Sequence, residues 1–176
     1  MEQQQIISQL KEKHSSFIAY IHSLSNEEFL FSLNGKWSAG QQLDHICRSV
    51  KPLTQIAIVP KFMIRLLFGK ANRQSKSYEE LIKKYLLKLE AGGKASGKFI
   101  PKIIHPDQKE KLTTALSKSV ERLTSAISHF SEEELDTLIL PHPLLGKLTV
   151  REMLYFTMYH VEHHLSIIKR DLAAGK

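Results

Sequence analysis

The chain has 176 residues, 42% of them hydrophobic, and carries 25 Lys and Arg against 18 Asp and Glu, for a net charge of +7. This size suits one domain with its own core over residues 1–176, and no apolar run reaches the roughly 18–20 residues of a membrane span. The single cysteine, Cys47, excludes an internal disulfide and a cysteine-cluster zinc site, and because the N-terminus lacks a signal-peptide pattern we expect a cytoplasmic protein without membrane contact.

Helix-start signals recur along the chain. In a capping box, Ser or Thr is followed three residues later by Glu or Gln, and the pairs here are Ser25/Glu28, Ser38/Gln41, Ser77/Glu80, Ser131/Glu134 and Thr149/Glu152. Asp107/Glu110, after Pro106, is a related pattern. Each pair opens an apolar-periodic run, so together they predict an all-α chain.

Apolar spacing predicts four long helices, at about residues 2–24, 39–59, 108–130 and 150–172. In the second of these, Pro52 is expected to cause a kink and Pro60 a break. A long connection separates the second helix from the third, so these two helices either lie as parallel neighbours or cross the end of the bundle. The predicted architecture is a four-helix bundle with one long crossover.

The crossover contains a basic insertion at about residues 61–104. Residues 61–111 hold 13 Lys and Arg against 5 Asp and Glu. We expect short helices at residues 62–68 and 78–90, a flexible loop at 91–97 and an extended connector at 99–101. The lysines are spaced and no arginine-rich or aromatic-interleaved motif accompanies them, which favours a solvated surface over a nucleic-acid site.

Two histidines near the C-terminus have the spacing of metal ligands. His160 and His164 are four residues apart, so on a helix they stand about 40° apart and one above the other. They fall within the apolar stripe of the last predicted helix, whereas Arg151 and Glu162 fall near the opposite face. Two buried imidazoles need polar partners, and a shared metal ion supplies one.

A third ligand is expected from another helix, and His45 is the best candidate. It lies on the flank of the apolar stripe of the second helix, with Gln42 and Ser49 on the same side. Three neutral imidazoles leave a position for water or substrate, which is the pattern of catalytic zinc and is workable for nickel, iron or manganese.

At these residues the sequence resembles the DinB/YfiT-like superfamily of four-helix-bundle proteins. The resemblance rests on Trp37-Ser38 leading into His45, on the loop His142-Pro143-Leu144-Leu145-Gly146-Lys147-Leu148-Thr149, and on the ending His160-Val161-Glu162-His163-His164. It implies a DinB-like fold in which His45, His160 and His164 bind a divalent metal ion, foremost zinc or nickel.

The resemblance also implies a range of functions. Characterised relatives include thiol transferases that use bacillithiol or mycothiol, which implies a small-molecule substrate and a thiol cosubstrate, and family members are often dimers. The basic insertion departs from these relatives, and we expect it to cover the mouth of the site. We expect a homodimer, for which the segment at residues 62–68 is a candidate interface.

Several residues near the three histidines are candidates for supporting or pocket-lining roles: Gln42, Ser49, His142 and His163. Asp44 lies about 100° from His45 and is favoured as a partner of a ligand over a general base. Glu162 points about 160° away from His160 and is a poor candidate for a base.

Three further residues are expected in structural roles. Trp37 is interpreted as a core anchor, His14 as a hydrogen-bonded core histidine, and Cys47 as a thiol that points away from His45.

We therefore predict a divalent-metal-dependent enzyme, either a transferase of low-molecular-weight thiols or a hydrolase. A metal lowers the pKa of a bound thiol, so the transferase needs no protein cysteine. A hydrolase uses a metal-bound nucleophile instead. The alternative is a non-enzymatic bundle that holds the metal structurally or binds a ligand, and nucleic-acid binding through the basic insertion is the least favoured interpretation.

Overall fold

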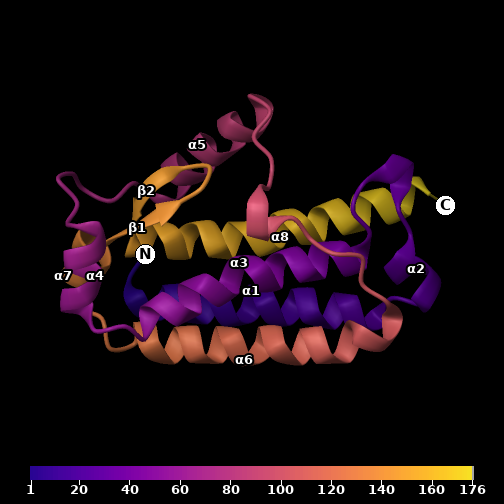
Figure 1. Ribbon diagram of the computed structural model, residues 1–176, viewed down its shortest axis with the longest axis horizontal. Helices are drawn as coiled ribbons and strands as arrows, with labels where there is room; N and C mark the ends of the chain where they lie inside the picture. Colours follow the sequence, from indigo (N-terminus) through magenta and orange to yellow (C-terminus); the bar gives the residue numbers. More distant parts are fainter. Residues whose placement is uncertain (176) are drawn as a thin grey trace.

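Four long helices form the bundle in the computed structural model, which describes residues 1–175: α1 (Gln3–Ser23), α3 (Ala39–Ala57), α6 (Lys109–Ile127) and α8 (Val150–Ala174) (Figure 1). α1 packs against α6 and α8, and α3 packs against the same two helices. α3 and α6 run in the same direction, so the crossover joins parallel neighbours (Figure 1). The predicted four-helix bundle with a long crossover is confirmed. Within the described residues, no helix combines the length and apolar character that crossing a membrane requires.

Capping boxes begin the helices where the sequence predicts them. All five Ser and Thr pairs form reciprocal hydrogen bonds, although those at Ser25 and Ser131 begin only the short helices α2 (Asn26–Leu30) and α7 (Glu132–Thr137). The Asp107 prediction is wrong. The box is formed by His105 and Gln108 around a 3₁₀ turn, η3 (Pro106–Gln108), and α6 starts after it. A second 3₁₀ turn, η1 (Leu33–Gly35), precedes α3.

A β-hairpin occupies the segment that is predicted to be a loop before α8. Strands β1 (Ile139–His142) and β2 (Gly146–Thr149) pair antiparallel and lead directly into α8. Gly146 has φ +78°, a conformation that glycine adopts without strain. Two short apolar runs separated by a Pro- and Gly-containing turn are the usual signal for a hairpin, so the sequence did contain it.

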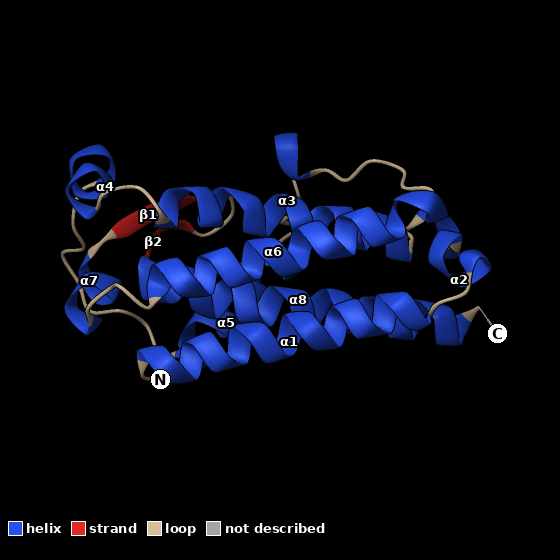
Figure 2. Cartoon of the chain, turned by 90° about the horizontal axis from the view of Figure 1, so that it is seen from below, coloured by secondary structure: helices blue, strands red, loops and turns tan. Residues whose placement is uncertain are grey.

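The insertion forms two helices and a 3₁₀ turn on one side of the bundle: α4 (Lys61–Phe68), α5 (Tyr78–Glu90) and η2 (Gly97–Phe99). α4 packs against β1, α5 packs against α8, and η2 contacts α3 (Figures 1 and 2). The residues after α5 therefore return across the bundle and bring η2 onto α3.

A buried histidine, His14, and a half-buried cysteine, Cys47, lie away from the insertion. His14 is 1% exposed, and its Nδ1 contacts the carbonyl of Leu10 at 2.7 Å, but its Nε2 has no partner within the described residues. The expectation of a fully hydrogen-bonded histidine is therefore only half correct. Cys47 faces the carbonyl of Leu112 on α6, 3.6 Å from its Sγ, so its structural assignment agrees with the contacts.

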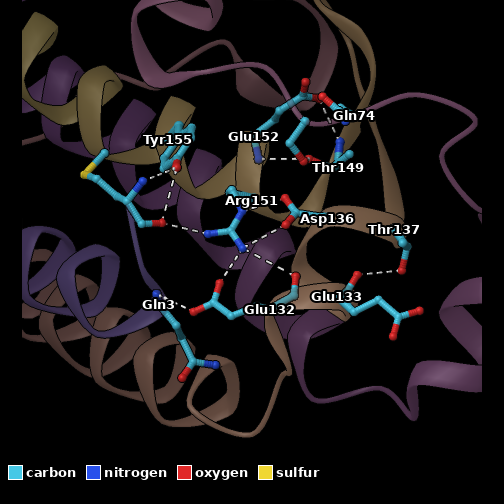
Figure 3. Close-up of polar contacts among 12 residues, drawn as sticks. Gln3, Gln74, Glu132, Glu133, Asp136, Thr137, Thr149, Arg151, Glu152 and Tyr155 are labelled. Carbon is cyan, nitrogen blue, oxygen red and sulfur yellow. Dashed lines mark hydrogen bonds and ion pairs between the residues drawn. The ribbon is translucent and has the colours of Figure 1, made fainter.

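An ion-pair network fixes the start of the chain to α8. The guanidinium of Arg151 donates to the carboxylates of Asp136 and Glu132 on α7 and to the backbone carbonyl of Met1 (Figure 3). The Met1 amine lies 3.1 Å from the Tyr155 hydroxyl. These contacts hold α7, the N-terminus and α8 together at one end of the bundle.

Candidate metal centre

The capping box at the start of α3 sets the position of the first histidine. The Ser38 hydroxyl accepts a hydrogen bond from the backbone N–H of Gln41, whose side chain accepts one from the backbone N–H of Ser38. The helix therefore begins at Ala39, and His45 faces the bundle interior with 5% exposure.

α8 supplies the other two histidines and packs against α3. His160 and His164, one turn apart, are 5% and 6% exposed, and their Nε2 atoms are 3.0 Å apart. Nε2 of His45 lies 3.1 Å from Nε2 of His160. The structure thus brings the three predicted histidines together in one buried cluster, with ligand nitrogens all within 4.8 Å of one another.

Hydrogen bonds on the far side of two rings decide which nitrogen carries the proton. Nδ1 of His45 lies 2.7 Å from the carbonyl oxygen of Phe99, which can only accept, so Nδ1 is protonated and Nε2 presents a lone pair. Nδ1 of His164 pairs in the same way with Oε1 of Gln42. The amide nitrogen of Gln42 donates to the Trp37 carbonyl at 3.4 Å, which fixes the amide orientation.

Two lone pairs therefore point at Nε2 of His160, which holds at most one proton. Without a cation, that proton can lie in only one of the two close contacts, and the other contact brings two nitrogens together with no proton between them. Nitrogens that each lie about 2.1 Å from one ion are about 3.0–3.4 Å apart at bond angles of about 90–110°. The separations of 3.1 and 3.0 Å fit this arrangement, so the cluster is suited to a divalent metal ion.

Burial keeps the three rings in the form that binds metals. It lowers the pKa of His45, and it lowers the pKa values of His160 and His164 far below 6.5, helped by the neighbouring imidazoles. At neutral pH all three rings are therefore neutral, as metal ligation requires.

Asp44 acts on the centre through the backbone of the insertion. Its carboxylate accepts hydrogen bonds from Nε of Arg48 at 2.6 Å and from the backbone N–H of Lys102 at 2.8 Å. Arg48 in turn donates to the carbonyl of Lys98 at 3.1 Å. These contacts hold the segment around Phe99 in place, so Asp44 positions the carbonyl that orients His45 and does not bind the His45 ring itself.

Ser49 and His142 lie at a cavity beside the cluster. Ser49 donates to the backbone carbonyl of His45 at 2.9 Å. Nδ1 of His142 accepts hydrogen bonds from the backbone N–H groups of Leu144 and Leu145, at 3.2 and 3.1 Å, which orders the hairpin turn. His142 therefore carries its proton on Nε2 and also lines the cavity.

His163 lines the same cavity without joining the cluster. Its ring packs against those of Tyr85, Tyr159 and His164, and burial lowers its pKa. Glu162, one residue earlier, forms an ion pair with Lys13 at 2.5 Å and points away from the cavity.

The cavity has a volume of about 710 Å³, within the usual range of small-molecule sites. The three histidines form part of its wall, and the insertion supplies Phe68, Tyr85, Leu89, residues 93–96, Lys98 and Phe99. The expectation that the insertion covers the site agrees with this lining.

Phe99, Tyr85 and Trp37 are among the cavity residues that the sequence did not identify as site residues. Phe99 contributes a backbone carbonyl, a role that any residue type can fill and that leaves no sequence signal. Tyr85 lies on an amphipathic helix whose partner could not be inferred. Trp37, expected as a core anchor, stacks on His164 at 6.4 Å between ring centroids and lines the cavity.

The chain belongs to the DinB superfamily, whose family model matches residues 9–168. Among curated proteins, it is similar to the uncharacterized protein YuaE of Bacillus subtilis (strain 168), with 43% identity over 49 residues. That match covers 28% of this chain and spans only 30% of the length of YuaE. No solved structure matches the chain.

Proposed function

We propose that this protein is a divalent-metal-dependent enzyme that acts on a small molecule in the cavity beside His45, His160 and His164. The observation that carries the proposal is the convergence of the three Nε2 atoms at the wall of a 710 Å³ cavity. Three protein ligands beside a cavity is the arrangement of catalytic zinc sites, whereas structural sites are closed by four. Imidazole donors favour zinc or nickel and also accept iron and manganese.

A divalent ion held by these nitrogens would supply a Lewis acid that lowers the pKa of a thiol or a water bound to it. The chain itself offers no thiol for this chemistry. Cys47 contacts α6, and burial raises the pKa of its thiol to about 12, so it stays protonated. A transferase reaction therefore requires a thiol cosubstrate from solution.

Hydrolysis, the second reaction open to the site, requires a proton acceptor near the cluster. No Asp or Glu of the described chain lines the cavity. His163 lines it, forms no hydrogen bond to the described residues and is kept neutral by burial, so it is the group suited to accept a proton. His142 is not suited, because its Nδ1 is already occupied by two backbone N–H groups.

Metal analysis of purified protein tests the proposal. We expect about one divalent ion per chain in the wild type, and a loss of at least tenfold in metal affinity for His160→Ala. His129→Ala, which removes an exposed histidine far from the cluster, is the matched control and is expected to bind normally. Wild-type protein without metal affinity, or unchanged affinity in His160→Ala, would contradict the proposal.

A structural metal is the second candidate, because the cluster is buried between two core helices. Metal at about 100 times its Kd stabilises a fold by about 2.7 kcal/mol, or about 5–10 °C in Tm for a chain of this size. Both functions predict this shift. Visible spectroscopy of the cobalt-substituted protein distinguishes the two functions. Added thiol should change the spectrum if the metal has an open position, whereas the spectrum of a closed structural site would not change.

The nucleic-acid alternative gains little from the structure. Three basic residues of the insertion, Lys61, Arg73 and Lys76, form ion pairs within the protein, with Glu134 or Glu152. Their charges are used in folding the insertion onto the bundle.

A further inference from the structure

The charged side chains that line the cavity are all basic. Apart from histidines, its charged lining residues are Lys94 and Lys98, and no carboxylate of the described chain lies among them. Both lysines are exposed, Lys94 on the loop between α5 and η2 and Lys98 within η2, whereas the three histidines are buried. The cavity therefore has a cationic rim and a deep end formed by the cluster.

Neither lysine is engaged by an acid. Within the described chain no carboxylate lies at ion-pair distance from the ammonium of Lys94 or Lys98, and the Lys98 ammonium lies 5.5 Å from the centre of the Phe99 ring. Lys61 and Lys76, elsewhere in the insertion, are paired with Glu134 and Glu152. What distinguishes the rim lysines is therefore their place on the cavity, together with the lack of a carboxylate partner supplied by the fold.

The loop that carries these lysines is held against the bundle. Arg48 donates to the Lys98 carbonyl at 3.1 Å and is itself paired with Asp44. At the other end, a Cβ on Gly93 would lie 2.6 Å from the backbone carbonyl oxygen of Lys88, so glycine is needed where the loop leaves α5, and Gly93 also lies close to a methyl group of Leu144 on the hairpin turn. Both lysines are therefore positioned by contacts and do not hang on a free loop.

Between the rim and the cluster the wall is mainly apolar. Aromatic residues from several parts of the chain line the cavity, namely Trp37, Tyr85, Phe99 and Phe156, and the hydroxyl of Tyr85 forms no hydrogen bond to the described residues. Such a wall favours an apolar ligand body with few polar groups.

We propose that the substrate of this cavity is an amphipathic small molecule with an anionic group, which Lys94 and Lys98 bind at the rim while its apolar body lies along the aromatic wall. The reacting end then reaches the histidine cluster. That the bound molecule is a substrate rests on the proposed function. The anion selectivity of the rim does not depend on a metal.

The test compares two probes of the same shape, naphthalene-2-carboxylate and naphthalene-2-carboxamide, by calorimetric titration of chelator-treated and metal-loaded protein. We expect the carboxylate to bind at least about fivefold more tightly than the carboxamide in both forms, because two ion pairs each add a modest attraction. In Lys94→Gln/Lys98→Gln the ratio should fall to about one, with the carboxamide affinity unchanged. The control Lys111→Gln/Lys118→Gln, on exposed positions of α6, removes the same charge and should keep the ratio.

Three outcomes would overturn the proposal: equal binding of the two probes, a ratio unaffected by the rim substitutions, or no binding of either probe. A preference for the carboxylate that needs the metal and ignores the lysines would place the anion at the cluster. That result would remove the rim assignment and leave the proposed function standing. Failure of the proposed function would appear instead in the metal analysis of His160→Ala.

Discussion

Nδ1 of His45 lies 2.7 Å from the carbonyl oxygen of Phe99, a residue of the insertion. The orientation of a ring on α3 therefore depends on a segment that enters the bundle from outside it. Asp44 and Arg48, on the same helix, hold that segment. The insertion is thus part of the centre as well as its cover.

Asp44→Ala should weaken metal binding although Asp44 does not contact the cluster. The substitution removes the acceptor for Arg48 and for the Lys102 N–H, so the Phe99 carbonyl is less well placed. We expect a loss of about tenfold in metal affinity, as for other groups that orient a ligand, measured by competition with a chromophoric chelator. Glu133→Ala removes an exposed carboxylate on α7 and should leave the affinity unchanged, and an equal loss in both variants would contradict the assignment.

The amide of Gln42 should control the tautomer of His164. Gln42→Leu removes the acceptor of the Nδ1 proton and should lower metal affinity by about tenfold or more. Gln42→Glu keeps an acceptor at the same place and should retain the affinity, which separates loss of the hydrogen bond from a general packing defect. Equal metal affinities for the two variants would show that the hydrogen bond does not matter.

His14 should make the fold less stable in mild acid. Burial lowers its pKa from 6.5 to about 4, so between these values the unfolded chain binds a proton that the folded chain does not. The contribution of the neutral His14 ring to the free energy of unfolding is therefore complete above pH 6.5. It is lost as the pH drops toward about 4, by at most about 3 kcal/mol. Urea unfolding of chelator-treated protein at several pH values should show a smaller acid loss for His14→Leu. The same pH dependence in His14→Leu and wild type would reject this account.

Arg151 should be essential for stability at the end of the bundle shown in Figure 3. It is 8% exposed and contacts Asp136 and Glu132, so its removal leaves two carboxylates without their cation. Because these carboxylates are nearly half exposed and can be solvated, we expect Arg151→Ala to lower the free energy of unfolding by about 1–2 kcal/mol, measured by urea titration. Arg122→Ala, at an exposed position of α6, should cost less than about 0.5 kcal/mol, and similar losses in the two variants would argue against the network.

We propose that α4 forms a homodimer interface, since several of its apolar side chains are not covered by the bundle. Phe62, Leu66 and Leu67 are 71%, 81% and 62% exposed, while Ile64 faces inward with 1%. Phe62→Ser/Leu66→Ser should shift the protein from dimer to monomer in sedimentation velocity without lowering Tm. A wild-type monomer at high concentration, or an unchanged dimer in the variant, would reject the interface.

Local sequence signals are sufficient for the helices and for the positions of the histidines within them. Capping boxes fix where a helix begins because their hydrogen bonds are local, and four-residue spacing fixes which residues share a face, so His160 and His164 can be paired from the sequence alone. His45 can be nominated from its place on the stripe of its own helix. The hairpin before α8 is the exception: its turn signal is present in the sequence, but strands of only four residues are too short for their alternation to predict pairing firmly.

The surroundings of the histidines, in contrast, depend on the packed fold. The Phe99 carbonyl and the rim lysines belong to the insertion, and they reach the cavity only because the insertion folds back onto α3. The Gln42 amide reaches His164 only because α3 packs against α8. A backbone carbonyl carries no side-chain signal, and a lysine on a loop looks the same in sequence whether it faces solvent or a cavity. The ligands are therefore predictable from periodicity, whereas their proton positions and the chemistry of the cavity follow from contacts that form only when the chain is folded.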